Sequence, residues 1–139
     1  MTERSSMCWA RAGLAVAVTL AVVAPAHAQQ TGAPPFAPAV VDSLAARGRT
    51  IYEGSARCGV CHGDEGGGTL DGPDLTDRSW LRGSGTYQEI LSMVRHGISR
   101  RDAETGNPMP VRGWEPVDDS AAIAVAVYVW TLSREPPRR

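Results

Sequence analysis

The residues with the most distinctive chemistry in this sequence are two cysteines, Cys58 and Cys61, and the histidine that follows them, His62. Two thiols at this spacing can form a disulfide, supply half of a zinc site, or bond to the two vinyl groups on one edge of a porphyrin. In the porphyrin case the adjacent imidazole projects toward the iron. The three alternatives predict different partners elsewhere in the chain.

The partners that a zinc site needs are missing from the sequence after residue 28. Zinc would require further cysteine or histidine ligands, yet this part of the chain has no other cysteine, and His96 is its only other histidine. A redox disulfide does not need His62, and no βαβ pattern surrounds the pair. The motif therefore predicts one haem c, attached covalently through Cys58 and Cys61, with His62 as a ligand of the iron.

Residues 1–28 have the features of a secretory signal peptide. Arginines precede an apolar run over residues 12–24, and Ala26-His27-Ala28 is a small-x-small cleavage site. The run is shorter than the roughly 20 residues that span a bilayer, which favours a cleaved leader. An uncleaved membrane tether is the alternative. Cleavage would remove the third cysteine, Cys8, and we expect the mature chain in the periplasm, an oxidising compartment.

The whole sequence has 139 residues, which is enough for one domain of ordinary size. Its 14 basic and 15 acidic residues give a net charge of -1, which excludes the basic surface of a general nucleic-acid binder. The 15 glycines and 10 prolines predict long irregular loops between few helices.

Hydrophobic periodicity predicts a first helix over residues 41–52. Gly48 lies in the middle of its apolar face, where a glycine costs about 1 kcal/mol of helix propensity. We therefore expect Gly48 to let another backbone or an aromatic ring approach closely.

Two further helices follow from their capping signals. The sequence Thr86-Tyr87-Gln88-Glu89 is a capping box, and Gly97 is a plausible end for the helix that it starts. The last helix begins at Asp118 or Asp119 and contains the apolar stretch 121–132. The predicted fold is all-α, with a disordered lead-in at residues 29–39, a folded domain at 40–133 and a polar tail at 134–139.

The order of several short motifs resembles that of the class I c-type cytochromes. The motifs are Gly48-x-x-x-Tyr52, Cys58-x-x-Cys61-His62-Gly63, Gly72-Pro73-Asp74-Leu75, Pro108-Met109-Pro110 and Tyr128-Val129-Trp130. Within the class, Leu75-Thr76-Asp77 with Trp80-Leu81 and Gly83 looks like the cytochrome c domains of bacterial haem-copper oxidase subunits and their soluble relatives. The resemblance implies a cytochrome c fold, in which three main helices and long loops wrap one haem.

The resemblance also implies roles for individual residues. Met109 would be the sixth ligand of the iron, with Met93, His96 or an open site as alternatives. The carbonyl of Pro73 would accept the Nδ1 proton of the proximal His62. Trp80 would either donate to a haem propionate or pack in the core.

Two further matches concern aromatic residues of the helices. Gly48 would lie against Tyr128 where the first and last helices cross. Five residues separate Tyr52 from Cys58, more than is familiar in the family, which puts in doubt whether Tyr52 reaches the haem edge.

With His62 and Met109 both bound, the iron would have no vacant position, which implies an electron carrier rather than an enzyme. The expected partners are redox proteins: a quinol-oxidising complex or periplasmic dehydrogenase as donor and an oxidase as acceptor, with the carrier a monomer. A haem enzyme or gas-binding sensor with a labile distal ligand is the alternative. The acidic loop that follows the haem motif leaves calcium binding open.

Overall fold

Four α-helices form the regular structure of residues 32–134, which are the residues that this computed structural model describes. They are α1 (Pro38–Glu53), α2 (Gly59–His62), α3 (Tyr87–His96) and α4 (Asp119–Leu132). The all-α prediction is confirmed, and α2 is a short helical turn in addition to the three predicted helices. The predicted signal peptide lies outside the described residues.

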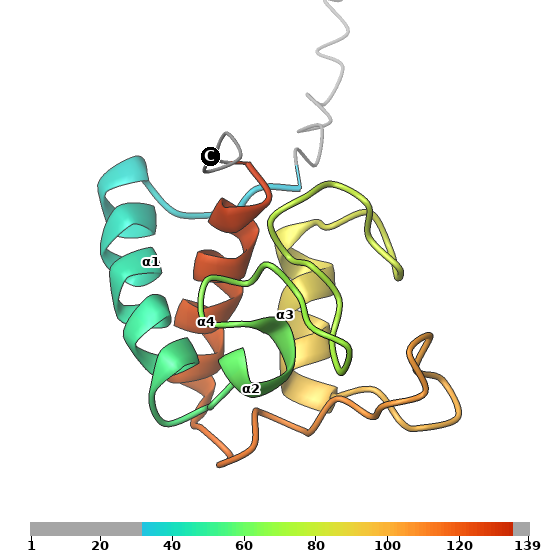
Figure 1. Ribbon diagram of the computed structural model, residues 1–139. Helices are drawn as coiled ribbons and strands as arrows, with labels where there is room; N and C mark the ends of the chain where they lie inside the picture. Colours follow the sequence, from blue (N-terminus) through green and yellow to red (C-terminus); the bar gives the residue numbers. More distant parts are fainter. Residues whose placement is uncertain (1–31, 135–139) are drawn as a thin grey trace, which may run out of the picture.

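Helices α1 and α4 pack side by side, and α3 lies on the other side of α4 (Figure 1). Residues on nearly every side of α4 are buried, because α4 contacts both of these helices. This explains its almost continuous apolar sequence. The buried core joins Tyr52 of α1, Ile90 and Leu91 of α3, and Val125 and Leu132 of α4.

The crossing of α1 and α4 depends on Gly48, as the sequence predicts. A Cβ atom at this position would lie 2.8 Å from Tyr128 Cβ and closer still to the carbonyl of Ala124. The ring of Tyr128 in turn meets that of Tyr52 edge to face, with centroids 5.3 Å apart. The absence of a side chain at Gly48 therefore lets the two helices approach to backbone contact.

We expect Gly48→Ala to lower the free energy of unfolding by about 2 kcal/mol, because the cost of overpacking exceeds the gain in helix propensity. Chemical denaturation of the haem-loaded protein measures the change. Gly67→Ala is the matched control, since a Cβ at Gly67 meets no atom within 4 Å. Equal stability of the two variants would contradict the close packing.

The N-terminus of α3 has the predicted capping box. The Thr86 side chain accepts from the Glu89 backbone N–H, and Glu89 Oε2 accepts from the backbone N–H of Thr86 and of Ser84, each at 3.0 Å. These hydrogen bonds, that from Ser84 first, lower the pKa of Glu89 to about 2. Since the folded state favours the ionised carboxyl, Glu89 stabilises the fold at neutral pH and ceases to do so as the pH falls toward 2.

Glu89→Ala is expected to lower the stability at pH 7 by about 1 kcal/mol, the usual cost of losing a cap. The difference from the wild type should shrink between the ordinary pKa of 4.5 and the folded value of about 2. Denaturant titrations of both proteins over this pH range measure the difference in their free energies of unfolding. Glu89→Gln keeps an acceptor oxygen, so its stability should lie between those of the wild type and Glu89→Ala. A stability difference that does not depend on pH would contradict the role of the charge.

The predicted disordered lead-in, residues 29–39, is wrong over its described part. Gly32 O accepts a hydrogen bond from Tyr87 N at 2.7 Å, and Phe36 packs edge to face on Tyr87. Proline and alanine composition suggested disorder, but Pro38 is instead at the first turn of α1, where it suits a helix. Residues 32–37 therefore connect α1 to the start of α3.

The first residue of the predicted polar tail, Arg134, is also in contact with the domain. Its guanidinium lies 4.3 Å from the centre of the Trp130 ring and donates to Gly85 O at 3.2 Å. The remainder of the predicted tail, residues 135–139, lies outside the described residues.

Candidate functional site

A large apolar cleft opens between the helices and the two long loops. Residues of all four helices line it, together with parts of the loops before α3 and before α4. The empty space that its lining residues enclose is about 1290 Å³, counted out to the open mouth. The structure brings every residue of the predicted site to this cleft: Cys58, Cys61, His62, Pro73, Trp80 and Met109.

The short helix α2 places the two cysteines and the histidine on one face. Cys58 precedes its first residue, and Cys61 and His62 are its last two, so the three side chains have the i, i+3, i+4 spacing of a helical face. Both thiols are free, and burial raises the pKa of Cys58 to about 11. A protonated, half-buried thiol is a poor redox nucleophile, which disfavours a redox-active pair.

The imidazole of His62 is held in one tautomer. Its Nδ1 lies 2.9 Å from Pro73 O, and because a carbonyl only accepts, Nδ1 carries the proton. Burial lowers the pKa of His62, so the ring is neutral and Nε2 keeps its lone pair. Gly72 allows this approach, because a Cβ there would lie 2.8 Å from Cys61 O. His62 is therefore ready to bind a metal through Nε2.

Met109 is fixed by backbone pairing that the sequence did not predict. Met109 and Ile98 exchange two hydrogen bonds, each 2.9 Å long, in an isolated antiparallel bridge. Gly97, at φ +66°, permits the close approach of the Met109 carbonyl. The bridge closes the loop between α3 and α4 at its base and holds Met109 on the wall of the cleft.

Of the two side chains that are alternatives to Met109 as iron ligand, Met93 lines the cleft and His96 does not. The exposed His96 does not line the cleft, and its Nδ1 interacts with Ser92 O of its own helix at 2.9 Å. Met93 is half-buried, packs against the core and lines the cleft. Two methionines therefore face the cleft, and Met93 contributes to its lining from the flank of α3.

Tyr52 and Trp80, the two aromatic residues that the family resemblance singles out, also reach the cleft. Tyr52 is fully buried, lines the cleft and donates to Gly63 O at 3.0 Å. The long spacing to Cys58 is absorbed by a tight turn in which Arg57 adopts φ +50° and Cys58 N donates to Tyr52 O. The indole of Trp80 lines the cleft next to Gly85, whose missing Cβ makes room for the Nε1 edge.

The acidic loop forms turns rather than a cation site. Asp74 Oδ1 accepts from Thr76 N at 2.7 Å, and Asp77 Oδ1 accepts from Ser79 N at 2.8 Å. Within residues 32–134 no three His, Cys, Asp or Glu side chains are grouped so that they could hold a metal ion.

The cleft therefore fits a haem by the chemistry of its donors. It offers two free thiols on the same face as a neutral imidazole, a thioether on the loop that closes it, and an apolar lining. The thiols can carry a porphyrin through thioether bonds, and the nitrogen and sulfur donors suit an iron.

The family model for cytochrome c matches residues 45–133, which is more than half of the chain and includes all of this cleft's predicted site residues. The chain belongs to the cytochrome c family. It is a class I c-type cytochrome, as the order of its motifs predicts. Members of this family carry haem c bound covalently.

Curated relatives of this cytochrome are oxidase subunits. It is 34% identical over 101 residues to the cbb3-type cytochrome c oxidase subunit FixP of Azorhizobium caulinodans, covering 72% of this chain and 33% of that protein. It is 38% identical over 93 residues to FixP of Bradyrhizobium diazoefficiens, covering 63% of this chain and 27% of the relative. The chain thus spans about a third or less of the length of these relatives. No solved structure is significantly similar to it.

The described residues contain no helix that is both long enough and apolar enough to cross a bilayer.

Proposed function

We propose that this cytochrome is a periplasmic carrier that takes up and passes on one electron at a time. The observation that carries the proposal is that the Cys58-x-x-Cys61-His62 face and Met109 line the same apolar cleft. When bound, haem c supplies an iron that alternates between Fe(III) and Fe(II). Cys58 and Cys61 would attach it, and His62 and Met109 would be its axial ligands.

The residues of the cleft favour electron exchange over catalysis. Pro73 fixes the orientation of His62 and makes its imidazole a stronger donor. A methionine thioether opposite a histidine favours Fe(II) and raises the reduction potential. An iron with both axial positions filled has no place for a substrate. With haem bound, the apolar part of the lining would keep water from the iron and so disfavour the more highly charged oxidised state.

The proposed partners follow from the oxidase subunits to which the chain is similar. The donor would be a quinol-oxidising complex or a periplasmic dehydrogenase, and the acceptor an oxidase. The signal peptide predicted from residues 1–28 supports export. N-terminal sequencing of the purified protein distinguishes a cleaved leader from a membrane tether.

The reduced protein should not bind carbon monoxide at neutral pH if both axial positions are filled. The absorption spectrum of the dithionite-reduced protein, recorded before and after addition of carbon monoxide, tests this. Unchanged spectra support the carrier. A carbonyl complex that forms at once would contradict it and favour a haem enzyme or gas-binding sensor with a labile distal ligand.

A further inference from the structure

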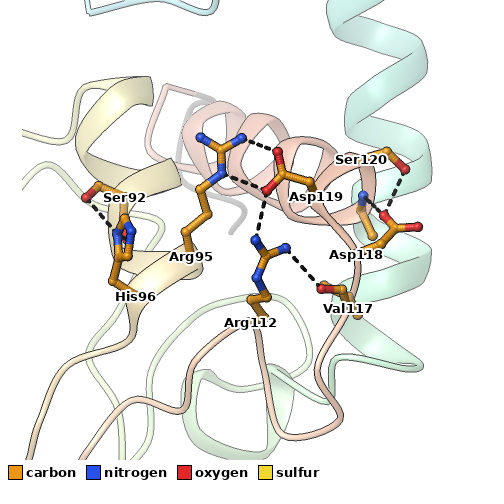
Figure 2. A network of polar contacts seen from close by, with 9 residues as sticks. Ser92, Arg95, His96, Arg112, Val117, Asp118, Asp119 and Ser120 are labelled. Atoms are coloured by element: carbon orange, nitrogen blue, oxygen red, sulfur yellow. Dashed lines mark hydrogen bonds and ion pairs between the residues drawn. The ribbon is translucent and has the colours of Figure 1, made fainter.

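The loop that carries Met109 is tied to two helices by a network of charged side chains that centres on Asp119 (Figure 2). Arg112 Nη2 lies 3.0 Å from Asp119 Oδ1, and Arg112 Nη1 donates to Val117 O at 3.3 Å. Arg95 of α3 approaches the same carboxylate with both Nε and Nη2, at 3.1 and 2.5 Å. One carboxylate in the first turn of α4 therefore holds an arginine from the loop and an arginine from α3.

The backbone of Arg112 is in an unfavourable conformation, which suggests that its side chain is needed. Its φ is +60°, in the left-handed region that is unfavourable for a residue with a Cβ. Glycine would adopt this conformation without strain. The arginine gains instead the contacts to Asp119 and Val117, because the left-handed turn directs its guanidinium toward the start of α4.

The position of Arg112 connects these contacts to Met109. It follows Met109 by three residues, lines the same cleft, and its backbone N–H donates to Val94 O of α3 at 2.8 Å. The bridge to Ile98 attaches the loop at Met109. Three residues later, the contacts of Arg112 attach the loop to α3 and to the start of α4. Met109 makes the first of these attachments itself, and Arg112 makes the second one.

Asp119, to which Arg112 is bonded, lies in the first turn of a helix that is firmly packed. Helix α4 is buried against α1 and α3, and the Asp118 side chain caps it by accepting from Ala121 N at 2.8 Å. The hydrogen bond from Arg95 lowers the pKa of Asp119, so its carboxylate stays ionised at neutral pH. Negative charge in the first turn is also favourable to α4 itself.

We infer that Arg112 is a positioning residue, which with Asp119 keeps Met109 on the iron by restraining the loop. The inference rests on the proposed function, in which Met109 is the sixth ligand. Arg112 does not touch the ligand atoms, so it acts on the rate at which the methionine leaves rather than on the bond itself.

The test is the rate at which imidazole binds to the oxidised holoprotein, followed by absorption in stopped flow. At about pH 8 imidazole is mostly neutral, so the altered charges have little effect on its approach, and at high concentration its binding is limited by dissociation of Met109. We expect Arg112→Gly to raise this limiting rate about three- to tenfold, although the variant relieves the backbone strain; tenfold corresponds to about 1.4 kcal/mol. Asp119→Asn should raise it similarly.

Two matched variants separate positioning from general loss of charge. Arg95→Gln removes an arginine from the same carboxylate but leaves the loop attached, and should raise the rate less than twofold. Glu53→Gln removes the exposed pair of Glu53 with Arg49 on α1, at 2.7 Å, and should leave the rate unchanged. The methionine-to-iron charge-transfer band should persist in every variant.

The inference is overturned if Arg112→Gly and Asp119→Asn bind imidazole at the wild-type rate while the band is present. It is also overturned if Glu53→Gln accelerates binding equally, since the effect would then be non-specific. A wild-type protein without the band would instead refute the proposed function, so the two failures are distinguishable.

Discussion

Met109→Ala is expected to lower the reduction potential by on the order of 0.2 V, within the roughly 0.8 V range over which axial ligands tune haem. Loss of the thioether removes a ligand that favours Fe(II) and leaves water or an added molecule to take the vacant position. The charge-transfer band of the oxidised protein should disappear, and the reduced variant should bind carbon monoxide. Redox titration and carbon monoxide difference spectra measure both changes.

Met93→Ala is the matched control, because Met93 also lines the cleft and packs against the core. It should keep the charge-transfer band and a potential close to the wild-type value, and lose stability through the cavity that it leaves. A reversal of the two results would show that Met93 is the ligand and that Met109 only packs.

The double variant Cys58→Ala/Cys61→Ala should produce a chain that is largely unfolded. Both thioether bonds would be lost, and the apolar cleft would lose the group against which its loops pack. Two of the connections, before α3 and before α4, contain no helix, so the core left to stabilise them is small. Circular dichroism in the near ultraviolet should show little fixed aromatic structure.

The single variant Cys58→Ala keeps one thioether and serves as the control for the double variant. It should retain haem on a denaturing gel, whereas the double variant should release haem into acidified organic solvent. A double variant that unfolds cooperatively without haem would contradict the view that haem supplies much of the core.

The features predicted correctly from the sequence are those fixed by residues close to one another in the chain. The capping box of Thr86 and Glu89 depends on residues within one turn, whereas the short helix α2 was not predicted. The need for space at Gly48 is also visible locally, because a glycine interrupts an apolar face. The family resemblance added the partner, Tyr128.

The features that were missed depend on pairings that no local pattern encodes. Asp119 is 24 residues from Arg95, and Arg112 contacts it through an unusual φ that an arginine does not signal. The bridge between Ile98 and Met109 has no alternating strand pattern. The ordered conformation of residues 32–37 depends on α3, because Gly32 accepts a hydrogen bond from Tyr87, more than fifty positions later in the sequence.

The proposed ligation of iron by Met109 is tested most directly by nuclear magnetic resonance of the reduced, diamagnetic protein labelled with ¹³C at its methionine methyl groups. A methyl group bound through sulfur to haem iron lies over the porphyrin face, where the ring current shifts its protons far upfield. One such methyl signal is expected in the wild type, and it should be absent from Met109→Ala and unchanged in Met93→Ala. A spectrum without an upfield methyl, or one in which Met93→Ala removes it, would contradict the assignment of Met109 as the sixth ligand.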